Sequence, residues 1–80
     1  MSKTAELLRK LRIKNNLTQK DLATRLNVNQ ALLSSWERGT RNLTLENAIK
    51  LSHIYKIPYN IIIDSLVNDV ALTLITSKTA

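Results

Sequence analysis

The sequence predicts an all-α fold, a compact bundle of five helices with a short apolar C-terminal extension. Leucine, isoleucine and alanine recur at helical spacing through most of the chain, as at Leu7, Leu8 and Leu11. Polar residues suited to helix capping precede several of these stretches. The 80 residues include one glycine and one proline, too few for the many tight turns of an all-β fold. A chain of this length forms a single small domain.

The first helix is predicted from about Thr4 to Asn15. Thr4 can cap its N-terminus, and Glu6 lies in the first turn, where the helix dipole favours an acidic side chain. Asn15 and Asn16 mark its end, because asparagine tolerates the left-handed conformation that terminates many helices.

Two capped amphipathic helices separated by a short turn are predicted within residues 18–38. Thr18 can cap the first of them, and Asp21 follows at the spacing of the acidic arm of a capping box. The apolar residues of this helix end at about Leu26. A pair of short helices in this arrangement is typical of a helix-turn-helix unit.

The turn and the second of these helices have their own signals. Asn27 can adopt a positive φ in the turn, and Asn29 can cap the next helix, which is predicted from Gln30 to Arg38. Gly39 is placed to end that helix, since glycine is strongly preferred at the first position after a helix.

A fourth helix, capped by Thr44, is predicted to end before Pro58. Its apolar stripe consists of Leu45, Ala48, Ile49, Leu51, Ser52 and Tyr55. Proline at the start and the spacing of Ile62 and Leu66 indicate a short fifth helix, although three consecutive isoleucines would also suit a strand.

Residues 1–67 are therefore assigned to a helix-turn-helix domain and residues 68–80 to a C-terminal tail. The tail holds further apolar residues, including Val70, Leu74 and Ile75. It could extend the fifth helix or form a strand paired with a second copy of the chain. In either form it is a candidate dimerisation segment.

The positive charge of the chain is confined to one half. Residues 1–41 contain nine Lys or Arg and three Asp or Glu, whereas residues 42–80 contain three of each. An excess in one half favours a polyanionic partner on that side of the molecule. The same excess of charge could also be ordinary solvated surface. Charge is therefore only supporting evidence for a polyanionic partner.

The helix at residues 30–38 carries the side chains best suited to read DNA. Gln30 can pair with adenine through two hydrogen bonds, and Ala31 can contact a thymine methyl group. Ser34 and Ser35 are expected to be exposed and small enough for the helix to enter the major groove deeply.

Other residues are expected to hold the phosphate backbone. Thr18 and Gln19 are both assigned to DNA binding, because they lie at a helix N-terminus that presents free N–H groups and partial positive charge. Arg38 and Arg41 flank Gly39 and can reach phosphates on either side of the groove. Asn42 is a further candidate for the same contact.

Two residues of the same helix are expected to be structural. Trp36 shares a face with Leu33, so it is assigned to the core rather than to base stacking. Glu37 is acidic within a helix that faces DNA, and a partly buried ion pair with Arg12 of the first helix would explain its presence.

The sequence offers no residues for an enzyme, a cofactor site or a metal site. Its only histidine, His53, has no cysteine or carboxylate group near it, and a single glycine cannot build a phosphate-binding loop. No signal peptide or apolar stretch long enough to span a membrane is present. The absence of cysteine fits a reducing compartment, so a cytoplasmic location is expected.

Residues 8–63 resemble the helix-turn-helix domain of lambda repressor and Cro-type regulators, the XRE family. The matching motifs are Leu8-Arg9-Lys10-Leu11-Arg12, Leu17-Thr18-Gln19 with Asp21-Leu22-Ala23, Leu26-Asn27-Val28, Trp36-Glu37-Arg38-Gly39 and Leu45-Glu46-Asn47. Two positions depart from the pattern, because Lys56 replaces a small residue and Pro58 opens the fifth helix in place of serine.

The resemblance implies a transcriptional regulator, most often a repressor of a phage or mobile element. Its third helix would enter the major groove of a palindromic operator in double-stranded DNA, with the protein bound as a homodimer. The residue matching Gln19 would grip phosphate, and those matching Asn29, Gln30, Ala31 and Ser35 would face bases. An Arg12–Glu37 pair is also a feature of the family.

A second interpretation is an interaction module of the antitoxin or anti-repressor type, which uses the C-terminal region to bind a partner protein. The basic N-terminal half argues against protein interaction as the sole role. The two roles can coexist in one chain.

Overall fold

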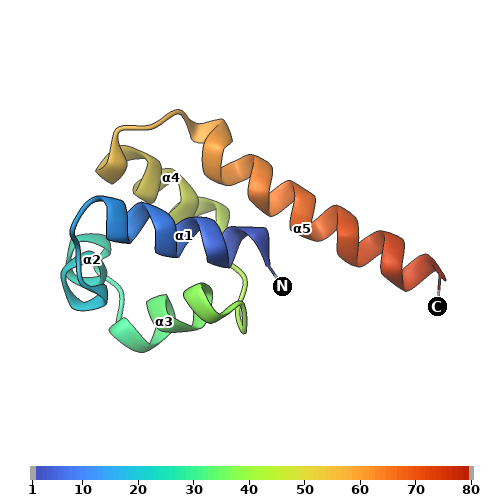
Figure 1. The fold of residues 1–80 in the computed structure, drawn as a ribbon, viewed down its shortest axis with the longest axis horizontal. Helices are drawn as coiled ribbons and strands as arrows, with labels where there is room; N and C mark the ends of the chain where they lie inside the picture. Colours follow the sequence, from blue (N-terminus) through green and yellow to red (C-terminus); the bar gives the residue numbers. More distant parts are fainter. Residues whose placement is uncertain (1, 80) are drawn as a thin grey trace.

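The computed structural model describes the backbone of residues 2–79 and the side chains of residues 2–72 and 74. Within these residues every regular element is a helix, as predicted, and Figure 1 shows the arrangement. The helices are α1 (Lys3–Lys14), α2 (Gln19–Leu26), α3 (Gln30–Arg38), α4 (Leu45–Tyr55) and α5 (Tyr59–Thr79). α1 lies between α3 on one side and α4 with the first half of α5 on the other, and the C-terminal part of α5 projects beyond the bundle.

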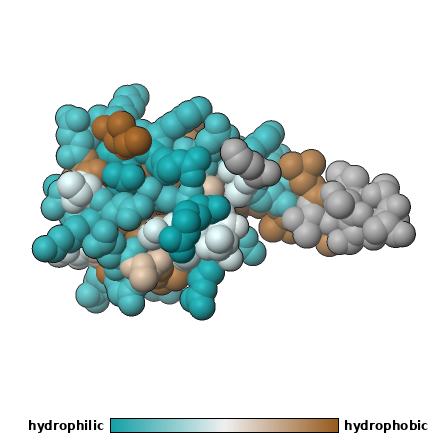
Figure 2. All heavy atoms as spheres, turned by 60° about the horizontal axis from the view of Figure 1, so that its bottom comes forward, coloured by the Kyte–Doolittle hydropathy of each residue, from teal (hydrophilic) through white to brown (hydrophobic). Residues whose placement is uncertain are grey.

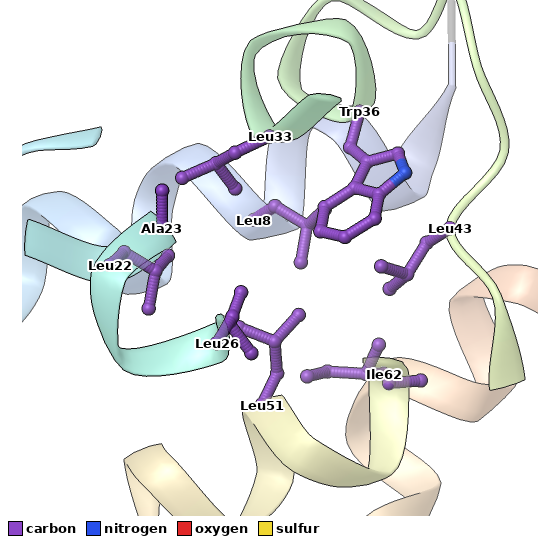
Figure 3. Close-up of a cluster of buried hydrophobic side chains, with 10 residues drawn as sticks. Leu8, Leu22, Ala23, Leu26, Leu33, Trp36, Leu43, Leu51 and Ile62 are labelled. Atoms are coloured by element: carbon purple, nitrogen blue, oxygen red, sulfur yellow. The ribbon is translucent and has the colours of Figure 1, made fainter. Parts of the chain in front are cut away.

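The core gathers side chains from all five helices and from the α3–α4 connector. Figure 3 shows Trp36 pointing from α3 toward Leu8, Leu43 and the other buried residues, so its assignment to the core is confirmed. The core consists of Leu8, Leu22, Ala23, Leu26, Leu33, Trp36, Leu43, Ala48, Leu51 and Ile62. Burial of these side chains fixes α3 to the rest of the bundle by one face and leaves the other face exposed.

The N-cap of α1 is Ser2, so the prediction of Thr4 as its cap is wrong. The Ser2 hydroxyl oxygen accepts a hydrogen bond from the amide of Ala5 at 3.1 Å. Thr4 lies instead inside the first turn, where it is buried and its hydroxyl is 3.0 Å from that of Ser65 in α5. Thr4 therefore contacts a residue that is distant in sequence instead of capping its own helix.

α4 has the predicted cap, since the Thr44 hydroxyl accepts from the amide of Asn47 at 3.2 Å. Two residues of its predicted apolar stripe, Leu45 and Ile49, are exposed, and that part of the prediction is wrong. Lys56 ends the helix in the left-handed conformation at φ 55°, which explains why a small residue is the usual choice at this position.

The fifth helix is a single element of 21 residues, which decides between the two conformations left open for the tail. No glycine or proline follows Pro58, so nothing in the sequence interrupts the helix after it starts at Tyr59. At 1.5 Å per residue α5 is about 31 Å long. It crosses the expected boundary between residues 67 and 68 without a break, and the side chain of Ile75 lies outside the described residues.

Candidate nucleic-acid interface

α2, the turn and α3 form a helix-turn-helix unit in which every predicted cap is present. Thr18 and Asp21 form a reciprocal capping box at the start of α2. Hydrogen bonds from the Thr18 hydroxyl and then from its backbone amide hold the pKa of Asp21 below its ordinary value. Asn27 adopts φ 57° in the turn, and Asn29 caps α3 by accepting from the amide of Leu32 at 3.0 Å.

The exposed side of α3 presents a row of polar and small side chains. Gln30, Ala31 and Arg38 are exposed, and Ser34 is half-buried among them. Together with Gln19 of α2 they line one open depression on the surface. The Arg38 guanidinium donates to the Ser34 hydroxyl oxygen at 3.1 Å, so these two side chains already lie side by side.

A second depression adjoins the first on the other side of Ala31, which lines both. It brings Arg41 of the α3–α4 connector next to Asn29 and the turn between α2 and α3. Arg41 and Asn42 are both exposed. Figure 2, in which the side of the molecule that carries α3 is turned forward, shows a mostly hydrophilic surface there. The structure thus brings candidates from α2, α3 and the connector to one face. Asn42 lines a different cavity, together with Ser2 and Asp69.

Ser35 helps to line the second depression, but its side chain is buried, and the prediction of its exposure is wrong. It is 7% exposed, and its hydroxyl donates to the carbonyl of Leu32 at 2.6 Å. After Gly39 the chain turns back over it, with the amide and hydroxyl of Thr40 donating to the Ser35 carbonyl at 3.0 and 3.2 Å. The connector, which the helical pattern of α3 does not reveal, covers this residue.

Glu37 is the anchor that joins α3 to α1 and α2. Its side chain is 2% exposed, and the Arg12 guanidinium donates to both carboxylate oxygens, from Nε at 2.8 Å and from Nη2 at 2.9 Å. The hydrogen bond with Glu37 raises the pKa of Arg12 against the opposing effect of burial. The predicted pair is therefore present and partly buried, with Glu37 buried and Arg12 half-buried.

Two further residues complete this anchor. The amide nitrogen of Gln19 donates to Glu37 Oε1 at 3.2 Å, and Arg9 donates to the Glu37 carbonyl oxygen. The Gln19 amide has a second N–H, so this bond leaves a donor for a ligand at the start of α2. Arg9 was not foreseen as a partner, although its position one turn before Arg12 on α1 is a signal that could have identified it.

Tyr55 of α4 is a second unforeseen neighbour of Glu37. Its hydroxyl oxygen is buried and has no hydrogen-bond partner among the described residues. Burial first, and the negative charge of Glu37 second, raise the pKa of Tyr55 to about 12. The sequence placed this residue on the apolar stripe of α4 and gave no sign of its charged neighbours.

The described residues contain no group of three or more His, Cys, Asp or Glu side chains that could hold a metal ion. No helix in that part of the chain combines the length and apolar character required to cross a membrane.

Comparison with known proteins identifies the fold and the family. The model of a family described as "Helix-turn-helix" matches residues 8–62, more than half of the chain. The restriction-modification controller protein C.Esp1396I has a similar structure, with a TM-score of 0.68 and 26% sequence identity over 86% of this chain and 88% of that protein. A single-residue variant of it gives a TM-score of 0.69 at 26% identity, over 88% of this chain and 89% of that one. No match is found among the curated proteins.

The match begins within α1 and ends in the first turn of α5, so it includes the whole of the capped helix-turn-helix unit. This chain belongs to the XRE-type helix-turn-helix family of DNA-binding transcription regulators.

Proposed function

We propose that the chain is a sequence-specific regulator, of the repressor type, that binds a palindromic operator as a homodimer. α3 lies in the major groove of each half-site. The observation that carries this proposal is the exposed row of Gln30, Ala31, Ser34 and Arg38 on a helix anchored from behind by Glu37. Direct readout requires side chains held in fixed geometry, and this anchor supplies it. The protein acts where operator DNA is, in the cytoplasm of a bacterial cell.

Each exposed side chain on this face has a distinct role in the proposal. Gln30 reads an adenine through its amide, and Ala31 contacts a thymine methyl group. Asn29 uses its side-chain oxygen as the cap of α3, so its amide nitrogen faces the DNA. Ser34 and Arg38 act together, because they are already hydrogen-bonded to each other.

Phosphate contacts frame the reading helix on two sides. The second N–H of the Gln19 amide and the free amides of the α2 N-terminus after Thr18 bind phosphate on one side. Arg41 and Asn42 bind it on the other. Ser35 is left out of the contact set because it is buried and its hydroxyl hydrogen is donated to the Leu32 carbonyl.

An apolar surface on α5 supports the homodimer. Its exposed residues include Val67, Val70 and Leu74, and Leu45 of α4 lies beside them. We name this surface the α5 groove; it is lined by Leu45, Ile63, Leu66, Val67, Val70, Ala71 and Leu74. An exposed apolar surface that projects from a small protein favours association, and a second copy places two α3 helices on one duplex.

A partner protein of the antitoxin or anti-repressor type could occupy the α5 groove instead. Removal of residues 68–80 does not separate the two cases, because Asp69 hydrogen-bonds to the start of α1 and its loss would disturb the bundle. The oligomeric state of the purified chain separates them. A homodimer that alone shifts duplex DNA supports the first case, and a monomer that needs a second protein supports the other.

Selection of bound duplexes from a random pool tests the proposed function. We expect an enriched palindrome whose half-sites lie about 10 base pairs apart or at a multiple of that spacing. An enriched site without two-fold symmetry would contradict the homodimer. DNA reading would be contradicted altogether if the pool showed no enrichment and the protein bound no duplex at low ionic strength.

A further inference from the structure

The N-terminus of α1 is capped from the far end of the sequence by Asp69 of α5. The Asp69 carboxylate accepts hydrogen bonds from the Ser2 hydroxyl at 2.8 Å and from the amides of Lys3 and Thr4 at 3.0 and 3.2 Å. One turn earlier on α5, Ser65 is 3.0 Å from the Thr4 hydroxyl. Two successive turns of α5 thus hold the first turn of α1, and the carboxylate lies at the positive end of its dipole.

The end of the reading helix rests on the same cap. Gly39 closes α3 at φ 76°, and a Cβ placed on it would lie 3.4 Å from the Cβ of Ser2 and 3.7 Å from that of Ala5. Arg41 and Asn42, which follow Gly39, line one cavity together with Ser2 and Asp69. The turn that presents these two residues is therefore packed against a residue that Asp69 holds.

We propose that Asp69 is a positioning residue for DNA binding. It fixes Ser2 at the start of α1, Ser2 supports the turn at Gly39, and this turn places Arg41 and Asn42 for contact with phosphate. This inference rests on the proposed function. Through Asp69, α5 would influence the reading face. Asp69 is also the neighbour of Val70, which is exposed on the same helix.

The three hydrogen bonds at the start of α1 require a carboxylate at position 69. Ser2 Oγ and the amides of Lys3 and Thr4 all donate to the carboxylate. An asparagine in its place has one acceptor oxygen and turns an NH2 group toward donors, so at least one of the three bonds is lost. The matched control is Asp64→Asn, which removes the same charge from an exposed position of the same helix.

The test compares Asp69→Asn and Asp64→Asn in the full chain with two measurements. The first is the backbone amide resonance of Gly39, the only glycine, which reports on the end of α3 without DNA. The second is the affinity for a 30-base-pair duplex that carries the sequence selected from the random pool. It is measured at protein concentrations where both variants have the same assembly state as the parent. We expect Asp69→Asn to shift the Gly39 resonance and weaken binding about three- to tenfold, with neither change in Asp64→Asn.

The Gly39 resonance and the affinity for DNA must both change in Asp69→Asn. An unmoved Gly39 resonance in Asp69→Asn overturns it, and so does a moved resonance with affinity unchanged. If Asp69→Asn does not fold, Ser2→Ala is judged by the same two criteria, since it removes the linking hydroxyl and leaves Asp69 in place. If the parent chain binds no duplex, the proposed function fails, and the Gly39 measurement still decides whether Asp69 positions the end of α3.

Discussion

Two exposed surfaces carry the proposed function, the outer side of α3 for DNA and the α5 groove for a second copy, and they are built differently. α3 is nine residues long, capped at both ends and tied from behind by Glu37. α5 has 21 residues, and its exposed part carries Val67, Val70 and Leu74 on a helix that projects from the bundle. A surface that reads bases requires fixed polar groups, whereas a surface that assembles copies requires apolar area.

The largest effect is expected where the anchor of α3 is broken. Glu37→Ala removes the carboxylate and leaves Arg12 without its partner, at a cost of about 3–5 kcal/mol in the free energy of unfolding. Urea denaturation measures it. The matched control is Glu46→Ala, because Glu46 and Lys50 form an exposed pair at 3.6 Å, and such a pair contributes roughly 0–1 kcal/mol. Equal losses in the two variants would show that the buried network does not anchor α3.

A charge placed in the α5 groove should weaken the proposed assembly of two copies. Val70→Asp raises the Kd of the homodimer by about thirtyfold or more, because a buried apolar contact is replaced by a desolvated carboxylate. Sedimentation velocity over a range of concentrations measures it. Asn68→Asp adds the same charge to a neighbouring residue that does not line the groove. A dimer that tolerates both substitutions equally must be formed by another surface.

Two substitutions on the reading side should differ in kind. Gln30→Ala should cost about 1–3 kcal/mol of binding free energy for the selected site and relax specificity at one base position. Arg41→Ala should weaken all duplexes to a similar degree and reduce the salt slope by about 1. Competition binding against single-base variants of the site distinguishes the two. If Gln30→Ala weakened every duplex equally, Gln30 would be a backbone contact.

The smallest effect is expected at Tyr55, behind the reading helix. Because its hydroxyl has no described partner, Tyr55→Phe should change the free energy of unfolding at pH 7 by less than about 1 kcal/mol.

Alkaline pH should reveal the Tyr55 hydroxyl. The pKa of Tyr55 in the folded protein is about 12, above its ordinary value of 10.0. The protonated hydroxyl therefore contributes its full share to the free energy of unfolding below pH 10, and this share is lost as the pH rises toward 12. Unfolding curves at several pH values should show a smaller alkaline loss for Tyr55→Phe than for the parent. If Tyr55→Phe lost as much stability at alkaline pH as the parent, ionisation of Tyr55 would not be the cause of the loss.

Local signals in the sequence were sufficient for most of the fold. Thr18, Asn29, Thr44 and Gly39 act within a few residues of their partners, so their roles follow from spacing alone. The family model confirms the helix-turn-helix assignment made from these signals.

The rest depends on contacts between residues far apart in the chain. Asp69 caps a helix 65 to 67 residues away, a distance that no local pattern encodes. Ser35 is buried by a connector whose path is not periodic, and Leu45 is exposed because the next helix leaves it uncovered beside the α5 groove. Helical periodicity predicts which residues share a face, and it does not predict what lies against that face.

The most direct test of the difference between the two surfaces is to map amide chemical shifts while the isotope-labelled protein is titrated with the selected duplex. We expect the largest changes in residues 18–20 and 29–42, with residues 64–72 of α5 changing little. Changes centred on α5, with α3 unaffected, would contradict the proposed function.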